Sequence, residues 1–134
     1  MERSLQGFLN PIQVENEKIV VSKRFMQDGK PIEWEIRPVT TEENDKLLKK
    51  HSKRNKKGAE TFDRSAYINE MIAEAVVFPD LKNAELQKAY GVIGEVALLT
   101  KMLLVGEFAT LSMAVQKLSG LDVDENEQLE EIKN

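Results

Sequence analysis

The chain has 134 residues, of which 41% are hydrophobic, and a formal net charge of −4, so it is long enough for one globular domain with its own core. It contains no cysteine, which excludes a disulfide framework, a thiolate zinc site and a cysteine nucleophile. The negative charge argues against general nucleic-acid binding. The first residues lack the apolar core and cleavage site of a secretory signal, so we expect a cytoplasmic protein.

The N-terminal part of the chain predicts a β-hairpin over residues 19–26 and 32–37. Between these segments lies Asp28-Gly29, a dipeptide favoured in two-residue type I′ turns. The turn predicts the following strand pairs: Phe25 with Ile32, Arg24 with Glu33, Lys23 with Trp34, and Val21 with Ile36. Because two strands alone are only marginally stable in water, we expect helices to cover the apolar face of this hairpin.

Two helices are predicted next. Thr40 and Glu43 have the spacing of a capping box, which predicts a mostly polar helix over residues 41–50. Residues 52–58 are rich in lysine and end in glycine, so we expect a mobile loop there. Pairs of apolar residues then recur at helical spacing over 67–76, which predicts an amphipathic helix that stops before Pro79.

Three more helices are predicted in the C-terminal third. Asn83 is placed to cap a short helix that Gly91 ends, and a nearly all-apolar helix follows over 93–105. Gly106 marks a bend to a last helix, ended by Gly120, whose inner face carries Phe108, Leu111, Val115 and Leu118. The acidic residues 121–134 are expected to be disordered. The predicted fold is α+β but mostly α, a single domain over 1–120 in which the hairpin packs against four to five helices.

No group of residues has the pattern of a catalytic or metal site. His51, the single histidine, lies in a lysine-rich segment and is interpreted as a solvated surface residue. The stretch that begins at Asp122 is similar to a calcium loop, but Glu127 replaces the required glycine and Lys133 the required bidentate glutamate. The glycines match no phosphate-binding or dinucleotide motif. We therefore expect no catalytic residue, no cofactor and no bound metal.

The helix over 93–105 is apolar nearly all round, so it is either a central core helix or one that offers a second face to a partner. It is too short to span a membrane, which takes roughly 20 apolar residues. We predict that a client or a second copy of the chain binds a surface made of Leu98, Leu99, Met102, Val105 and Phe108. The predicted core residues are Trp34, Ile36, Leu103 and Tyr90, of which Tyr90 also fits the surface group. Pro79, Gly91 and Gly106 are expected to set the angles between helices.

A basic stretch over residues 46–57 supports an alternative function. Its cationic residues are Lys46, Lys49, Lys50, Lys53, Arg54, Lys56 and Lys57. Such a stretch can contact phosphates, although it lacks the interleaved aromatic residues that bind single strands. A solvated flexible face is the favoured interpretation of this stretch. The alternative function is a small nucleic-acid-binding regulator.

Three groups of residues, taken in order, resemble a known protein family. They are Trp34-Glu-Ile36-Arg37-Pro38-Val39-Thr40; Phe78-Pro79-Asp80-Leu81 with Asn83-Ala84-Glu85-Leu86-Gln87 and Tyr90-Gly91; and Lys101-Met102-Leu103-Leu104 with Gly106-Glu107. In this order they resemble the XkdN-like phage tail assembly chaperones of Gram-positive hosts. The resemblance covers the chain from about Trp34 to Gly120, and no catalytic residue is among its motifs.

The resemblance implies a non-enzymatic protein of a phage or prophage that acts in the host cytoplasm and is absent from the mature virion. Its implied partner is the tape measure protein, a long helical client that it keeps soluble while tail tube subunits polymerise. A longer, frameshifted form is implied to recruit the tube protein, and this chain resembles the shorter form. The chain can also form a homo-oligomer on this interpretation. No membrane partner is expected, and a nucleic-acid partner is not favoured.

Overall fold

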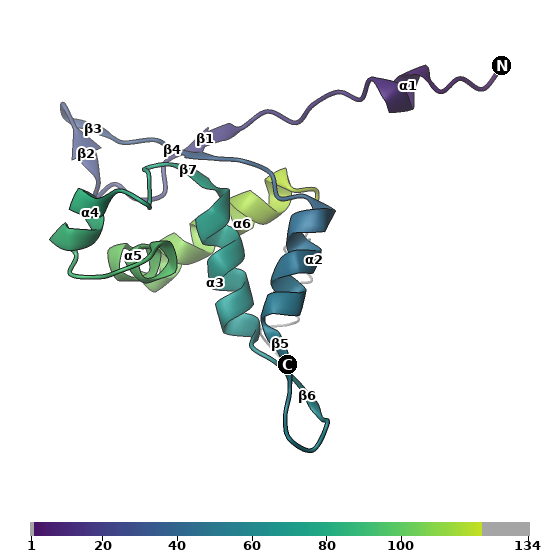
Figure 1. Ribbon diagram of the computed structural model, residues 1–134. Coiled ribbons are helices and arrows are strands. Elements are labelled where there is room, and N and C mark those ends of the chain that lie inside the picture. Colours follow the sequence, from purple (N-terminus) through teal and green to yellow (C-terminus); the bar gives the residue numbers. More distant parts are fainter. Residues whose placement is uncertain (1, 122–134) are drawn as a thin grey trace, which may run out of the picture.

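The computed structural model describes residues 2–121, which contain six helices and seven short strands (Figure 1). In chain order these are α1 (Gln6–Leu9), β1 (Glu17–Ile19), β2 (Met26–Gln27), β3 (Lys30–Pro31), β4 (Trp34–Ile36), α2 (Thr41–Lys50), β5 (Ser52–Arg54), β6 (Glu60–Phe62), α3 (Arg64–Ala75), β7 (Val76–Phe78), α4 (Ala84–Ala89), α5 (Glu95–Met102) and α6 (Val105–Leu118). The predicted mixture of a small amount of strand with mostly helix is confirmed.

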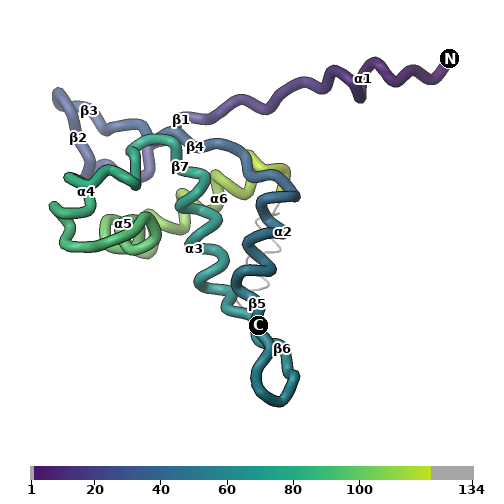
Figure 2. The backbone as a smooth tube through the Cα atoms, in the orientation of Figure 1, coloured from purple at the N-terminus to yellow at the C-terminus, as the bar shows by residue number. Residues whose placement is uncertain are grey.

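A three-stranded antiparallel sheet, in the order β1-β4-β7, lies across one end of the helices (Figure 1). Its central strand, β4, carries Trp34 and Ile36, which are 1% and 0% exposed. Alternate residues of a strand share a face, so both side chains point into the same core. On the other side of this core α3 contacts α2, α5 and α6, and the tube in Figure 2 shows α3 running between α2 and α5.

The predicted hairpin turn is present, but the predicted pairing holds only next to it. Asp28 and Gly29 both have positive φ, 51° and 78°, as a type I′ turn requires, and Ile32 N donates to Phe25 O at 2.8 Å. Beyond that pair the register changes, because Trp34 lies opposite Ile19 and not Lys23. Ile36 likewise lies opposite Glu17 and not Val21.

The register changes because residues 20–24 leave the ladder and fold onto the helices. Val21 and Ser22 are buried there, and Arg24 forms an ion pair with Glu107 at the start of α6. The predicted pair between Arg24 and Glu33 is therefore wrong. Residues 20–24 bury Val21 and pair Arg24 with Glu107. They carry no alternating pattern from which this departure from the strand ladder could be predicted.

Three of the described strands, β5, β6 and β7, were not predicted. Residues 76–78 were assigned to the end of a helix, yet α3 ends at Ala75 and β7 pairs with β4. Residues 52–58 were predicted as a loop, yet β5 pairs with β6 in a two-stranded hairpin. Each of these strands is three residues long, which is too short for a periodicity to identify.

The helix starts were predicted well. The Thr40 capping box is confirmed, with Glu43 N donating to Thr40 Oγ1 and Thr40 N donating to Glu43 Oε1, both at 3.2 Å. Asn83 caps α4 by accepting from Leu86 N at 2.9 Å. The predicted inner face of α6 is also confirmed, since Leu111 and Val115 are fully buried and Phe108 and Leu118 pack against the core.

The predicted apolar helix over 93–105 is shorter than expected. α5 covers Glu95–Met102, and Leu103 takes an extended backbone with φ −104° and ψ 141°. The bend to α6 thus lies at Leu103 and Leu104, while Gly106 is already inside α6. The other predicted angle-setting glycine, Gly91, has φ 66° and follows α4.

At the N-terminus, residues 2–16 form an extended arm that leaves the sheet at β1 and projects away from the helices (Figures 1 and 2). The arm contains α1, a single helical turn without buried residues. Among residues 2–121 no helix combines the length and the apolar character needed to cross a membrane. The predicted disorder of the acidic tail concerns residues 122–134, which lie outside the described residues.

Candidate functional site

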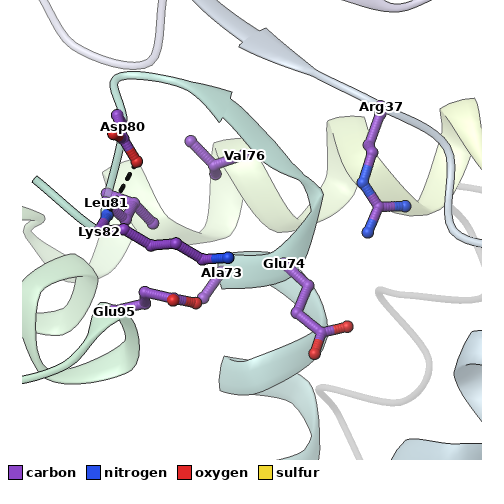
Figure 3. A pocket seen from close by; sticks show the side chains of 8 residues that line it. All are labelled: Arg37, Ala73, Glu74, Val76, Asp80, Leu81, Lys82 and Glu95. Carbon is purple, nitrogen blue, oxygen red and sulfur yellow. Dashed lines mark hydrogen bonds between the residues drawn. The ribbon is translucent and has the colours of Figure 1, made fainter.

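A polar hollow of about 600 Å³ lies between the sheet, α3 and the start of α5. It is lined by Arg37, Ala73, Glu74, Val76, Asp80, Leu81, Lys82 and Glu95. Figure 3 shows Lys82 reaching across the hollow beside Glu95, with Arg37 on the far side. The described residues contain no group of three or more histidines and carboxylates that could hold a metal ion. The lining thus combines the positive charges of Arg37 and Lys82 with the carboxyl groups of Glu74, Asp80 and Glu95.

Glu74 is a lining carboxyl group whose pKa is raised. Partial burial raises the pKa of Glu74, and the nearby carboxylates of Glu70 and Glu43 raise it further. A carboxyl group can act as a general acid only where a reacting group and a partner base lie within hydrogen-bond reach. Elsewhere in the lining, the backbone N of Lys82 donates to Asp80 Oδ1 at 3.0 Å (Figure 3).

The single histidine is not the solvated residue that we predicted. Its side chain is 16% exposed, and His51 Nε2 lies 2.7 Å from Glu70 Oε2. Glu70 also forms an ion pair with Lys50. Burial by itself would raise the pKa of Glu70, but hydrogen bonds from Lys50 and His51 outweigh it and lower the pKa. Lys50, His51 and Glu70 thus join the end of α2 to α3. The lysine-rich sequence around His51 gives no sign of this contact between helices.

Of the five residues predicted as a client surface, three belong to the core. Leu98 and Leu99 are fully buried and Met102 is 6% exposed. These side chains are covered because α5 packs against α3. Val105 is 90% exposed, whereas Phe108 is half-buried against the core.

The predicted core residues lie where expected. Trp34, Ile36 and Leu103 are buried, and Tyr90 packs half-buried against them.

One exposed apolar surface of the helical part lies on α6. Val105, Ala109 and Met113 are all exposed, and their spacing of four residues places them on one face of the helix. Leu104, 62% exposed, precedes them at the bend. We call these four residues the α6 stripe. The sequence signal for the stripe is the apolar repeat at every fourth residue, Val105, Ala109 and Met113. It runs beside the predicted inner face of the same helix.

An ion-pair network fixes the start of the α6 stripe. Arg24 Nε donates to Glu107 Oε2 at 2.9 Å, and Arg24 Nη2 donates to Met102 O at 2.9 Å. Glu107 Oε1 accepts from Leu104 N at 2.7 Å. Hydrogen bonds from Arg24 and then from Leu104 N lower the pKa of Glu107 to about 2. At neutral pH Glu107 is therefore ionised, and it anchors both the 20–24 excursion and the first turn of α6.

The basic stretch divides between two elements. Lys53, Arg54, Lys56 and Lys57 are exposed on the β5–β6 hairpin, which projects beyond α2 and α3 (Figure 1). Asn55 shapes its turn, since Asn55 Oδ1 accepts from Lys57 N and Ala59 N, both at 2.9 Å. The arrangement presents positive charge at a protruding tip. Such a tip can attract an anionic partner of any kind by long-range steering.

The chain matches a known protein family over most of its length. The family model described as phage XkdN-like tail assembly chaperone protein matches residues 5–133. The chain is 30% identical over 129 residues to the phage-like element PBSX protein XkdN of Bacillus subtilis (strain 168), covering 92% of this chain and 87% of that protein. It is also 30% identical over 126 residues to YqbN of the same organism, covering 90% and 84%.

A solved structure has the same fold. The crystal structure of the protein YqbN superposes with a TM-score of 0.74 at 24% sequence identity. The superposition covers 91% of this chain and 98% of that one. The sheet, the helices and their order are therefore shared with an experimentally determined structure.

Proposed function

The chain belongs to the XkdN-like phage tail assembly chaperone family, and we propose that it binds the tape measure protein through the α6 stripe and keeps it soluble until the tail tube forms. The role is non-catalytic. It is carried out in the host cytoplasm, before the tail is complete, and the protein leaves before the virion is finished.

The observation that carries this proposal is the exposure of Val105, Ala109 and Met113 along one side of α6, while Leu111 and Val115 on another side are buried. Exposed apolar residues that gather on one face mark interaction sites more often than isolated ones do. The 105, 109, 113 repeat forms an i±4 ridge, which fits into the groove of another helix. A tape measure segment with an apolar helical face has the matching geometry.

The small size of the stripe suits a transient chaperone. Ala109 contributes only a methyl group, so the backbone of a partner helix can approach α6 closely at that point. An interface of a few side chains gives the weak binding that is characteristic of small contact areas. Growing tube subunits can then displace the chaperone one segment at a time.

Two neighbouring residues on α6 provide a matched test. Ala109 and Thr110 are both exposed but lie about 100° apart around the helix. Ala109→Asp places a charge in the stripe, whereas Thr110→Asp places the same charge outside it. Each variant is co-expressed with the tape measure protein of the same phage or prophage, and the soluble complex is measured by size-exclusion chromatography with light scattering.

We expect the wild-type chain and Thr110→Asp to form the complex and Ala109→Asp to lose at least nine-tenths of it. We also expect the wild-type complex to persist at high salt, because apolar burial does not release counterions. If both aspartate variants bind equally well, the client does not contact the stripe. If Lys53→Glu with Arg54→Glu abolishes binding and salt dissociates the complex, the basic hairpin is the contact.

A further inference from the structure

The β5–β6 hairpin concentrates positive charge in a chain that is negative overall. Residues 53–57 contain Lys53, Arg54, Lys56 and Lys57 and no carboxylate. None of these four side chains forms a salt bridge within residues 2–121. The formal net charge of −4 therefore arises in other parts of the chain. A local excess of cations on a protruding segment attracts anionic ligands to this end of the molecule.

Two carboxylates lie close to these cations, and both have other partners. Glu60 is paired with Arg54 in the strand register, where opposite charges across a strand pair attract one another. Asp63 Oδ1 accepts from Ala66 N at 3.1 Å and so caps α3. Residues 52–64 carry five cationic side chains and two carboxylates, a net charge of +3. The hairpin and its junction with α3 thus remain positive.

The fold supplies the aromatic residue that the basic stretch lacks in sequence. Phe62 lies opposite Ser52 in the β5–β6 register, and it is 44% exposed. Its ring packs against Tyr67, with the ring centroids 5.5 Å apart and the planes tilted by 52°. Tyr67 in turn donates a hydrogen bond to Asn44 of α2. The Phe62 ring is therefore held in place by the helices while part of it stays open to solvent, as a platform for base stacking must be.

A hollow of about 500 Å³ connects this ring with cations of two elements. Lys53 belongs to β5, and Arg64 is the first residue of α3. Asp63 N donates to His51 O at 3.0 Å, which fixes the base of the hairpin to the end of α2. The lining consists of His51, Lys53, Thr61, Phe62, Asp63 and Arg64. The hollow therefore combines an aromatic ring, a hydroxyl group and two flanking cations at a fixed junction.

We propose that this hollow and the tip of the β5–β6 hairpin bind single-stranded nucleic acid. One base stacks on Phe62, the neighbouring phosphates lie against Lys53 and Arg64, and the tip cations contact phosphates further along the strand. The exposed ring favours nucleic acid over an acidic protein segment. Every base has a face that stacks on an aromatic ring, whereas the negative face of the ring repels a carboxylate. The site shares no residue with the α6 stripe.

Fluorescence anisotropy with a labelled oligouridylate, and with an oligothymidylate of the same length, tests the charged part of the site. Lys56→Glu with Lys57→Glu reverses two charges at the tip. Lys23→Glu with Lys30→Glu is the matched control, because it changes the net charge equally at two exposed lysines. Lys23 precedes β2 and Lys30 begins β3, and Figure 1 shows these strands far from β5 and β6. We expect the tip variant to bind at least about tenfold more weakly than the control, with a smaller salt dependence.

The aromatic part of the site is tested by Phe62→Leu, which keeps an apolar side chain and removes the stacking face. We expect its affinity for the oligonucleotide to fall by about fivefold or more, while the dependence of affinity on salt stays that of the wild type. Phe62→Trp should retain the affinity. Phe78→Leu, at a ring that is 51% exposed, is the matched control and should bind like the wild type. Circular dichroism and melting temperature establish that each variant is folded.

Three results overturn the proposal. They are a wild-type chain that binds neither oligonucleotide at low salt, equal affinities of the tip variant and its control, and a Phe62→Leu variant with unchanged affinity. In the last case, a polyglutamate peptide that binds as tightly as the oligonucleotide identifies an acidic protein segment as the ligand. Ala109→Asp should bind the oligonucleotide like the wild type, so a failure of this proposal and a failure of the α6 stripe proposal are distinguishable.

Discussion

At the scale of single residues, Glu43 does more than cap a helix. Its carboxylate accepts from Thr40 N at 3.2 Å, and from Arg37 Nη1 and Nη2 at 3.0 and 2.7 Å. Arg37 directly follows β4. The bidentate pair therefore ties the central strand to the start of α2, and bidentate geometry makes it stronger than an ordinary surface ion pair.

Removing the cap hydroxyl tests the start of α2. Thr40→Ala deletes the acceptor for Glu43 N, and the loss of an N-cap side chain costs about 1 kcal/mol. Urea unfolding at pH 7 should show this decrease in the free energy of unfolding. Thr41→Ala, one residue further along and exposed, serves as the control. Equal stability of the two variants would show that the cap does not stabilise the fold.

The same carboxylate predicts a dependence of stability on pH. Hydrogen bonds from Arg37, and then from Thr40, lower the pKa of Glu43 from 4.5 to about 2. The folded state thus holds the proton less tightly than the unfolded state, so the stabilisation is fully present above pH 4.5 and is lost as the pH falls towards 2. Glu107 has a similarly low pKa and contributes in the same direction.

The variant Glu43→Gln cannot titrate at this position. We expect it to be less stable than wild type at pH 7 and to lose less stability than wild type between pH 5 and pH 2.5. Chemical unfolding at four pH values in that range measures both slopes. Parallel curves for the two proteins would contradict the assignment of the pH dependence to Glu43.

At the scale of elements, the sequence predicted those parts whose signals are local. The capping residues Thr40 and Asn83 and the Asp28-Gly29 turn act within four residues of themselves, and the structure confirms all three. The register of β1 on β4 depends on the distant contact of Arg24 with Glu107. No pattern within the hairpin contains that information, so the outer strand pairs were wrong.

The candidate surface was predicted only in part, for a related reason. An all-apolar helix indicates burial on two sides or a partner on one, and the sequence does not say how many elements surround it. α3 covers α5, which places Leu98 and Leu99 inside the core. Val105 was correctly placed outside, since α6 begins there after the unforeseen bend at Leu103 and Leu104.

Paired truncations test this reassignment. Leu99→Ala should lower the free energy of unfolding by about 2–5 kcal/mol, because it leaves a cavity in a packed core. Val105→Ala removes an exposed side chain and should change it by less than about 0.5 kcal/mol. Thermal and urea unfolding give both values. Similar small decreases in the free energy of unfolding for the two variants would show that Leu99 is not part of the packed core.

At the scale of the whole molecule, three features lie apart from one another on the body formed by the sheet and helices. They are the N-terminal arm, the basic β5–β6 hairpin and α6, the helix that carries the α6 stripe (Figure 1). Each offers a different chemistry, since the arm and the stripe are apolar and the hairpin is cationic. The proposed role of the stripe can therefore be abolished by Ala109→Asp while the arm and the hairpin stay unchanged.

The proposed release of this chain before the virion is finished gives a prediction for the particle. Mass spectrometry of purified tails or phage-like particles should detect the tube and tape measure proteins and no peptide of this chain, whereas the lysate before assembly should contain it together with the tape measure protein. Stoichiometric recovery of the chain in finished particles would identify it as a structural component.

The central claim is that the client contacts the α6 stripe, and methionine methyl NMR tests it most directly. Met113 on α6 and Met26 on β2 are similarly exposed, 45% and 49%, while Met71 and Met102 are buried. On adding a helical tape measure segment to the methyl-labelled chain, we predict that the Met113 signal shifts or broadens and the Met26 signal does not. A change at Met26 alone, or at neither exposed methionine while binding occurs, would contradict the account.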